Sequence, residues 1–434
     1  MKRAHKLLVV GGGAGGLELV AHLGLAKHSN VEMTLLDGRP THIWKPLLHE
    51  VATGSFNSGQ DELNYFSHSA ENNYKFLLGW MGGLDRKNKI VKVDALKVGG
   101  KLLCGPRDLH YDTLVMAIGS VPDTFGTPGA TKHCLFLNSP HDADELRLKM
   151  LIQGLSIIYG ASEVPKLRIG IVGAGATGIE LAAEIHHTIE SLAMTGFKLD
   201  NLETTIIEAS PRILSMADEK LAQFAKESLE KKNIQILTDT KITGVTDKGF
   251  ILGNGTFLKK ELRVWTAGVR SPRWLTKTGL STNHQSRILT NDYLQSVDDP
   301  DVFAIGDCSA THVQPGMQGH IKILPTTAQV AHQQSVWLRH YLKKRIIDGD
   351  TSGAAPFEFR SQGFLVSLGH RTAVGSLAII RGMKDYQVKG HLAKGLYVTL
   401  YRKHQAAIFG VPKMCSLLIG DQFHYMAMPE LKFH

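Results

Sequence analysis

Three glycines at a fixed spacing occur twice in this chain, and the chemistry they suit is the binding of a dinucleotide. Residues 9–18 read VVGGGAGGLE and residues 171–180 read IVGAGATGIE. The first glycine of such a loop makes a tight turn, the second lets the backbone approach a pyrophosphate, and the third packs helix against strand. The pyrophosphate then meets the helix N-terminus. We therefore predict two nucleotide sites, at Gly11, Gly13 and Gly16 and at Gly173, Gly175 and Gly178.

An acidic residue follows each glycine loop, at the end of a second apolar run. VEMTLLD ends in Asp37, 21 residues after Gly16, and TTIIE ends in Glu208, 30 residues after Gly178. An acid at this point bonds an adenosine ribose and repels a 2′-phosphate, which favours NADH over NADPH. The nearby Arg212 leaves NADPH tolerance open. The extra residues of the second copy predict a longer helix and a longer loop after it.

The elements that position these loops form a repeat of their own. KLLVV at 6–10 is a short apolar run, as expected of a buried parallel strand, and a helical pattern follows the glycines. TLVMAIGSVP at 113–122 matches RVWTAGVRSP at 263–272, while DVFAIGD at 301–307 has no copy. We expect this last strand to return to the first nucleotide site. The pattern predicts an α/β fold with two Rossmann-like dinucleotide-binding domains.

Composition excludes several classes of protein. The chain has 434 residues, of which 43% are apolar, enough for two or three domains. Its four cysteines form no CxxC pair, so neither a redox disulfide of the usual spacing nor a zinc site is expected. No run of about 18 apolar residues predicts a transmembrane helix. The net charge is +9, of which residues 381–434 carry +5, and no nucleic-acid-binding signature accompanies it.

Two further segments carry groups suited to an aromatic ring. HIWKPLLHEVATG at 42–54 places Lys45 and Pro46 in an apolar loop, where a cation can stabilise a reduced flavin. LPTTAQVAHQQ at 324–334 presents small residues for close packing and amides that can face a ring or a carbonyl, namely Ala328, Gln329, Ala331 and Gln333. The alternatives are an ordinary surface loop and a helix with no special role.

The order of these parts over residues 5–335 resembles the flavoproteins with two dinucleotide-binding domains. The resemblance implies that the first loop holds FAD non-covalently and that the second receives NADH as a substrate. It assigns Asp37 to the adenosine ribose of FAD, Asp307 to its ribityl or phosphate side, and Gly119 and Gly268 to turns beside the flavin and the nicotinamide. It also implies that the FAD domain, residues 1–122 and 291–350, is split by an inserted NADH domain, residues 163–290.

The C-terminal region, residues 351–434, predicts amphipathic helices. KGHLAKGLYVTLYRKHQAAIFG at 389–410 places Leu392, Leu396, Leu400 and Ala407 on one stripe, and a second short helix starts at Pro412. A basic amphipathic helix with aromatic residues is typical of a membrane surface. We therefore predict a helical membrane-anchoring region that binds the lipid bilayer. A helix that packs in the core or in a homodimer is the alternative.

The full set of motifs resembles the type II NADH:quinone oxidoreductases, the non-pumping respiratory NADH dehydrogenases. VVGGGAGG, WKPLLHEVATGS, TLVMAIGS, IVGAGATGIELAAE, WTAG, AIGD and AQVAHQ follow the order of that family. The resemblance implies a peripheral enzyme on the cytoplasmic face of a bacterial plasma membrane. Hydride would pass from NADH to FAD, and two electrons would then pass to ubiquinone or menaquinone.

The same resemblance assigns catalytic residues. Gln329 and Gln333 would face the quinone, Lys45 the flavin, and Glu180 the region between NADH, flavin and quinone. An acid in the first turn of a helix, as also found at Glu18, is the alternative for Glu180. Lys394 is the nearest candidate for a protonatable partner from the C-terminal helices.

Three other functions stay open at this point. A sulfide:quinone reductase would need cysteines beside the flavin, for which Cys134 or Cys308 are the candidates. A soluble NADH-dependent flavin reductase would not need the basic C-terminal helices. A flavoprotein with slow turnover that acts as a redox-sensing binding protein is the alternative outside enzymes.

Overall fold

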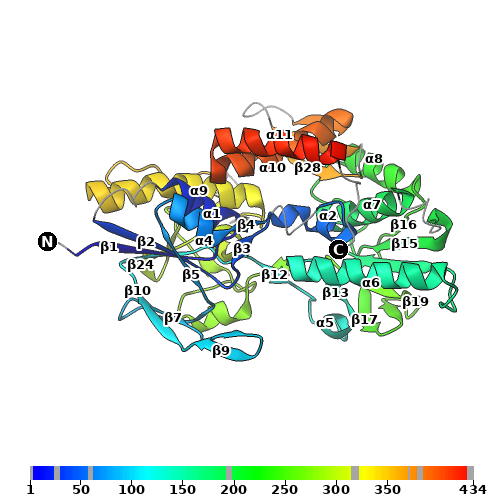
Figure 1. Ribbon diagram of the computed structural model, residues 1–434, viewed down its shortest axis with the longest axis horizontal. Coiled ribbons are helices and arrows are strands. Elements are labelled where there is room, and N and C mark those ends of the chain that lie inside the picture. Colours follow the sequence, from blue (N-terminus) through cyan, green and yellow to red (C-terminus); the bar gives the residue numbers. More distant parts are fainter. Residues whose placement is uncertain are drawn as a thin grey trace.

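Two parallel β-sheets, one for each glycine motif, lie side by side at the centre of the molecule (Figure 1). The computed structural model describes residues 3–23, 30–56, 62–191, 198–313, 322–369, 372–378 and 385–427. The first sheet has the order β23-β24-β11-β1-β2-β5, and the second has the order β13-β20-β14-β15-β16. All neighbours are parallel except β23, which pairs antiparallel with β24 at the edge. The predicted α/β dinucleotide-binding architecture is thus confirmed.

The strands fall where the apolar runs predicted them. In the first sheet they are β1 (His5–Val10), β2 (Val31–Asp37), β5 (Lys75–Leu78), β11 (Thr113–Met116), β23 (Gln295–Ser296) and β24 (Asp299–Ala304). In the second they are β13 (Leu135–Phe136), β14 (Leu167–Val172), β15 (Leu202–Ile207), β16 (Gln235–Leu237) and β20 (Leu262–Trp265). The last four residues of β1 and of β14 are buried, as expected where helices cover both faces of a parallel sheet.

The two halves repeat each other further than their sequences indicate. Helix α1 (Ala14–His22) and helix α7 (Ala176–Ser191) follow the two glycine loops, and α7 is the longer, as predicted. Each half then carries an antiparallel sheet, before β11 in the first half and before β20 in the second, which no pattern had predicted. These sheets consist of β6 (Met81–Asp85), β7 (Ile90–Val93) and β10 (Arg107–His110), and of β17 (Ile242–Thr246), β18 (Gly249–Leu252) and β19 (Phe257–Lys259).

The chain crosses between the halves twice, at adjacent points. Strand β12 (Val121–Pro122) pairs antiparallel with β21 (Val269–Arg270). Strand β13, which precedes residue 163, already pairs with β20 in the second sheet, and Leu275, Leu280 and Ile288 pack into the core of the first. The expected boundaries at 163 and 290 do not coincide with this packing. We propose that the inserted domain spans about residues 123–268.

The C-terminal region lies across both halves (Figure 1). It consists of β28 (Phe364–Ser367), β29 (Ala373–Leu377) and β30 (Tyr386–Gly390), followed by α10 (His391–Phe409) and α11 (Val411–Ala427). Both predicted helices are present. Helix α10 packs on α1 and on all three strands, and β28 packs on α7. One helix and one strand thereby connect the two nucleotide-binding helices.

The face that α10 buries is not the stripe that the sequence predicted. Leu392 is 66% exposed and Leu400 is 44% exposed. The buried residues are instead Ala393, Tyr397, His404, Gln405 and Ile408. The reason is that polar and aromatic side chains of this helix meet polar partners inside the molecule. Of the predicted stripe, only Leu396 packs against a core cluster, while Leu392 and Leu400 stay exposed.

Replacing the fully buried Phe303 of β24 tests the core of the first sheet. Its ring packs edge-on against Tyr341, with the centroids 6.0 Å apart. We expect Phe303→Ala to lower the free energy of unfolding by about 3–5 kcal/mol, since the cavity left behind cannot fully collapse. Phe257→Ala, at a ring that is 48% exposed, is the matched control for urea unfolding. Equal effects of the two changes would contradict this packing.

Candidate functional site

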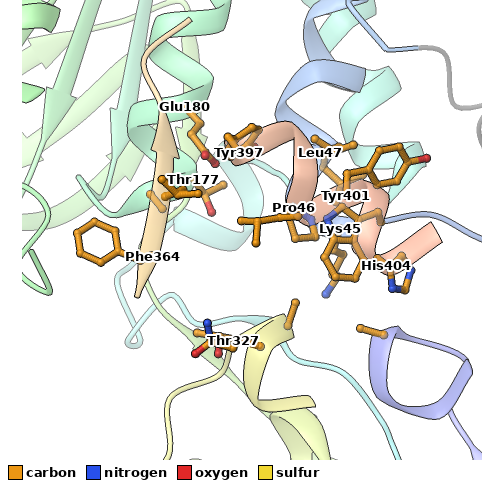
Figure 2. Close-up of a pocket in the computed structure, with 18 of the residues that line it drawn as sticks. Lys45, Pro46, Leu47, Thr177, Glu180, Thr327, Phe364, Tyr397, Tyr401 and His404 are labelled. Atoms are coloured by element: carbon orange, nitrogen blue, oxygen red, sulfur yellow. The ribbon is translucent and has the colours of Figure 1, made fainter. Parts of the chain in front are cut away.

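One large cavity, of about 1840 Å³, lies between the two nucleotide-binding halves and the C-terminal region. The starts of α1 and α7 reach it at Gly13 and Ala176, and α10 and α11 line it from the C-terminal side. Figure 2 shows Glu180 and Tyr397 at one end and Lys45 and His404 at the other. The arrangement brings both predicted nucleotide loops to a single space.

The two glycine loops have the same geometry. The backbone φ angle is +104° at both Gly11 and Gly173, in the region that favours glycine. A Cβ on Gly16 would lie 1.9 Å from the Gly11 carbonyl oxygen, and one on Gly178 would lie 2.0 Å from that of Gly173. Nothing lies within 4 Å of a Cβ built on the middle glycines, Gly13 and Gly175. Both loops therefore leave their backbone open to a pyrophosphate, and a dinucleotide fits each.

The acids at the strand ends take equivalent places. Asp37 accepts hydrogen bonds from the amides of Gly12 (2.6 Å) and Arg39 (2.9 Å). Glu208 accepts them from the amides of Ala174 (2.7 Å) and Ser210 (2.9 Å). Burial raises the pKa of Asp37, and these amides oppose the rise. Neither side chain lines the cavity itself, so each acid lies behind its loop, at the end of its strand, where a ribose bound along the loop would meet it.

A tyrosine that sequence analysis missed fixes the first loop. The Tyr65 hydroxyl, on α4 (Tyr65–Glu71), donates to the Gly12 carbonyl oxygen at 2.6 Å. A Cβ on Gly12 would lie 2.4 Å from this hydroxyl oxygen, so only glycine fits there. The second loop has Ala174 at the same place. No spacing relates Tyr65 to the loop, and only the fold brings the two together.

The side of the cavity where the sequence predicts the flavin carries a lysine and an aspartate. Lys45 and Pro46, in the short helix η2 (Lys45–Leu47), line the cavity with Gly119 and Asp307. The Lys45 ammonium faces the open cavity yet is enclosed by protein, and it donates to the Ser120 carbonyl oxygen (3.0 Å) and to Asn138 Oδ1 (2.8 Å). Burial lowers the pKa of Lys45, and Asp307 opposes the change. A cation is thus held at the wall without a carboxylate in direct contact.

The alanine and glutamine motif of residues 328–333 lies at the start of α9 (Ala328–Lys343), and only part of it reaches the cavity. Ala328 and Gln329 line it, and the Gln329 amide also accepts from the Gln362 amide nitrogen at 3.1 Å. Gln333 was expected to face the same space but does not line it. Its amide bonds the backbone of Arg360 in both directions, at 2.7 and 2.9 Å. The helix continues away from the cavity, so the glutamine one turn later meets a neighbouring segment.

The next residue, Gln334, is a second one that the sequence did not single out. It is fully buried and accepts from the Gly306 amide at 2.6 Å, while its amide nitrogen donates to Thr311 Oγ1 at 3.0 Å. These bonds hold the turn that carries Asp307. Asp307 in turn accepts from the Ser120 hydroxyl at 2.6 Å.

The carboxyl of Glu180 is buried at the far end of the cavity and is 6% exposed. It accepts from the Ser367 amide at 3.0 Å and lies 3.7 Å from His49 Nδ1. The Tyr397 hydroxyl faces it without reaching hydrogen-bond geometry (Figure 2). Burial raises the pKa of Glu180 to about 8, so the group holds its proton at neutral pH.

The structure also places Lys394 in this group. Its ammonium donates to Ser367 Oγ at 2.9 Å and lies 5.1 Å from the centre of the Tyr397 ring. The positive charge of Lys394 slightly lowers the pKa of Glu180, against the larger effect of burial. The loosely aligned candidate from the sequence therefore belongs to the Glu180 environment.

Thiol chemistry has no support at this site. Cys134 and Cys308 are buried, and burial raises the pKa of each thiol to about 12. Among the residues that the structure describes, no cysteine lines the cavity. A sulfur-carrying pair beside the expected flavin position is therefore not found in the described part of the chain.

Comparison with known proteins identifies the family. The pyridine nucleotide-disulphide oxidoreductase family matches residues 5–335. A type II NADH:quinone oxidoreductase of Haemophilus influenzae is 34% identical over 99% of both chains. One of Staphylococcus epidermidis is 30% identical over 85% of this chain and 89% of its own. The chain therefore belongs to the type II NADH:quinone oxidoreductase family.

Solved structures share the fold. NDH2 from Plasmodium falciparum, in complex with NADH, has a TM-score of 0.81 at 18% identity and covers 99% of this chain and 100% of its own. The sulfide:quinone oxidoreductase of Aquifex aeolicus has a TM-score of 0.73 at 17% identity, with coverages of 94% and 92%. The whole chain, C-terminal region included, therefore has counterparts of known structure.

The raised pKa of Glu180 predicts a pH-dependent stability. Between its ordinary value of 4.5 and about 8, the unfolded chain is ionised while the folded protein keeps the proton. The folded state therefore loses stability as pH rises through this range. Glu180→Gln lacks this titration, so its stability relative to the parent should rise by at most about 1.4 kcal/mol per pH unit.

Urea unfolding at about pH 5, 6.5 and 8 measures this difference. Glu190→Gln, at an exposed carboxyl on the same helix, is the matched control and should follow the parent at every pH. Curves for Glu180→Gln that stay parallel to the parent would contradict the buried, protonated state of Glu180.

Proposed function

We propose that this chain oxidises NADH and passes two electrons through bound FAD to a membrane quinone. The observation that carries the proposal is the single cavity that both glycine loops, the α9 motif and the C-terminal helices share. Two nucleotides that meet in one space can exchange a hydride, and the C-terminal side leaves room for a third reactant. The names of the relatives agree with this assignment. The proposal assigns no proton pumping to the chain.

The first loop is the FAD site in this proposal. The Tyr65 hydroxyl donates to the Gly12 carbonyl oxygen of this loop, and Asp37 accepts from the Gly12 amide. Asp307 and Gly119 line the adjoining part of the cavity. FAD supplies the chemistry that accepts a hydride and releases electrons. The protein supplies orientation, and Lys45 supplies a positive charge that favours an anionic ring nearby.

The second loop receives NADH. Its middle glycine, Gly175, is exposed, and Glu208 stands behind it as Asp37 does behind the first loop. Gly268 lines the cavity with a φ of +68°, and a Cβ there would lie 2.2 Å from the Phe125 ring. The Phe125 contact therefore requires glycine at this turn, and in our proposal the nicotinamide ring lies beside it.

The quinone side lies toward α10 and α11. Gln329 lines this part of the cavity and orients a quinone carbonyl, while Glu180 holds a proton that it can donate to a quinone oxygen. Leu417 and Leu418 of α11 line the cavity and are still 39% and 46% exposed. An apolar substrate can therefore reach the cavity between the C-terminal helices.

The outer face of these helices is the proposed membrane surface. The exposed apolar residues of these helices that do not line the cavity include Leu392, Val411 and Ile419. An apolar patch of this kind on a basic helix pair suits a lipid surface. No helix in the described ranges is long and apolar enough to span a bilayer. We place the protein on the cytoplasmic face of a bacterial plasma membrane, where NADH is available.

An anaerobic titration tests the proposed function. The purified protein should show a flavin spectrum that NADH bleaches and that a short-chain quinone then restores within the mixing time of a cuvette. Extraction and chromatography of the flavin should give FAD. Bleaching without rapid restoration would refute the quinone as acceptor, and absence of any bound flavin would refute the reading of the first loop.

The third glycine of the second loop predicts a selective defect. Gly178→Ala forces a Cβ to within 2.0 Å of the Gly173 carbonyl oxygen, so the loop and α7 must separate. We expect the KM for NADH to rise at least about tenfold, because the loss of roughly 1.4 kcal/mol of binding has that effect. The FAD content should stay unchanged. Gly253→Ala, at an exposed turn of the β18–β19 hairpin with only ordinary contacts around the added Cβ, is the control, and an equal KM change in both would contradict the assignment.

The outer face of α10 and α11 predicts membrane binding. Val411→Glu with Ile419→Glu changes two residues that are 61% and 60% exposed and do not line the cavity. Binding to anionic vesicles should fall at least about tenfold, because charged groups resist the apolar interface. Bleaching by NADH should be unaffected. The control is Leu148→Glu with Ile152→Glu on α6 (Pro140–Ile158), which are similarly exposed. Equal loss in both pairs would contradict the proposed surface.

A further inference from the structure

Glu18 of α1 occupies the same place in the first repeat as Glu180 in the second, and it too is buried. Its side chain is 2% exposed. One carboxylate oxygen accepts from His404 Nδ1 at 2.8 Å, and the other accepts from His332 Nδ1 at 2.5 Å. These partners come from α10 and α9, so three helices meet at one carboxyl group.

Two imidazoles are the groups in contact with this carboxylate. Burial raises the pKa of Glu18, but the hydrogen bonds from His332 and His404 outweigh it and bring the value to about 2. A buried carboxylate is costly unless a positive charge balances it. Burial lowers the pKa of His404, and its hydrogen bond with Glu18 opposes that change. One added proton on either ring balances the carboxylate, and the three groups can hold that proton as a unit.

The neighbours of His404 allow its ring to gain or lose this proton. Its Nε2 lies 3.0 Å from His42 Nε2, and the Trp44 ring stacks on it at 3.8 Å. Burial lowers the pKa of His42 to about 3, so His42 stays neutral. A neutral imidazole has one donor and one acceptor nitrogen, so His42 can accept from a protonated His404 or donate to a neutral one.

The other titratable or charged groups around these residues come from four elements. They are His22 on α1, His68 on α4, His42 on β3 (Thr41–His42), and Arg339 on α9. Burial lowers the pKa of His22 and of His68. Among these neighbours only Arg339 is always positively charged. Its charge lowers the pKa of His22.

The cavity reaches this group directly. Glu18, His42, His332 and His404 all line it, and the side chain of His332 is 24% exposed. His332 follows Gln329 by one turn of the same helix. A proton held by Glu18, His332 and His404 can therefore pass from His332 to a reactant bound beside Gln329. Water that enters the cavity can then return a proton to His332.

The proposed reaction needs one such proton. Reduction of a quinone to a quinol takes two electrons and two protons, whereas the hydride of NADH brings two electrons and one proton. The balance is NADH + H⁺ + quinone → NAD⁺ + quinol. One proton per turnover must enter from the medium through the protein.

We propose that Glu18, His332 and His404 form a proton-holding triad that delivers the medium's proton to the quinone through His332. Glu180, at the other end of the cavity, passes to the quinone the proton that arrives with the hydride (Figure 2). An N–H bond of the imidazolium breaks, an O–H bond of the quinol forms, and the imidazole left behind takes a proton from water. This inference rests on the proposed function.

Nitrogen NMR of the protein with ¹⁵N-labelled histidine tests the triad without turnover. At about pH 7 the parent should show one doubly protonated imidazole from the His332 and His404 pair, assigned with His332→Gln. Glu18→Gln keeps the hydrogen-bonding shape but not the charge, so both rings should become neutral there. Two neutral rings in the parent at about pH 7 would overturn the proposal, even if Glu18→Gln failed to fold.

Stopped-flow measurement of the two half-reactions separates proton delivery from structural damage. In Glu18→Gln at about pH 7, reoxidation by quinone should slow at least about tenfold, since general acid catalysis is worth that much or more. Reduction by NADH should stay within about twofold. The control is His340→Gln, an exposed histidine on α9, the helix that carries His332, and it should leave both rates unchanged.

The two possible failures can be told apart. Equal slowing of both half-reactions in Glu18→Gln would show a structural role and refute the triad. If the parent protein itself reduced no quinone, the proposed function would fail, while the NMR result would still report whether the triad holds a proton.

Discussion

Two carboxyl groups at equivalent places in a repeated fold lie buried beneath a single helix, and the rest of the site depends on how that helix satisfies them. Glu18 and Glu180 each follow a glycine loop, where water would normally solvate a side chain in the first turns of a helix. A buried carboxyl without partners would cost several kcal/mol. Helix α10 supplies His404 to one and carries Lys394 and Tyr397 to the surroundings of the other.

The two carboxyls end in opposite protonation states for this reason. Glu18 receives two imidazole hydrogen bonds and is ionised, while Glu180 receives one backbone amide and burial keeps it protonated. Groups whose environments push their pKa values apart are suited to different acid–base tasks. The repeat thus provides a scaffold with two identical positions, and the C-terminal region makes them unlike.

The same helix also explains why the C-terminal region presents an apolar outer face. Several of its polar and aromatic residues are buried against the rest of the molecule, so apolar residues such as Leu392 remain exposed. An exposed apolar face is stable only against something other than water. In the proposed function that partner is the lipid surface, which places the source of the quinone next to the opening between α10 and α11.

Local patterns made much of this predictable. The glycine loops, the acids after them and the buried strands depend on spacing within a few dozen residues, and the structure has them where expected. The contacts that define the chemistry are not local. Glu18 and His404 are 386 residues apart, and no spacing joins them. Gln333 and Gln334 are adjacent, and only the rotation of α9 against its neighbours decides which one holds the Asp307 turn.

The most direct test of this account is a structure of the protein in a lipid nanodisc, determined with FAD, NADH and a quinone analogue. The account predicts FAD along the first loop, the nicotinamide over Gly268, and the quinone head group near Gln329, with α10 and α11 on the lipid. Quinone density outside the shared cavity, or lipid on another face of the molecule, would contradict it.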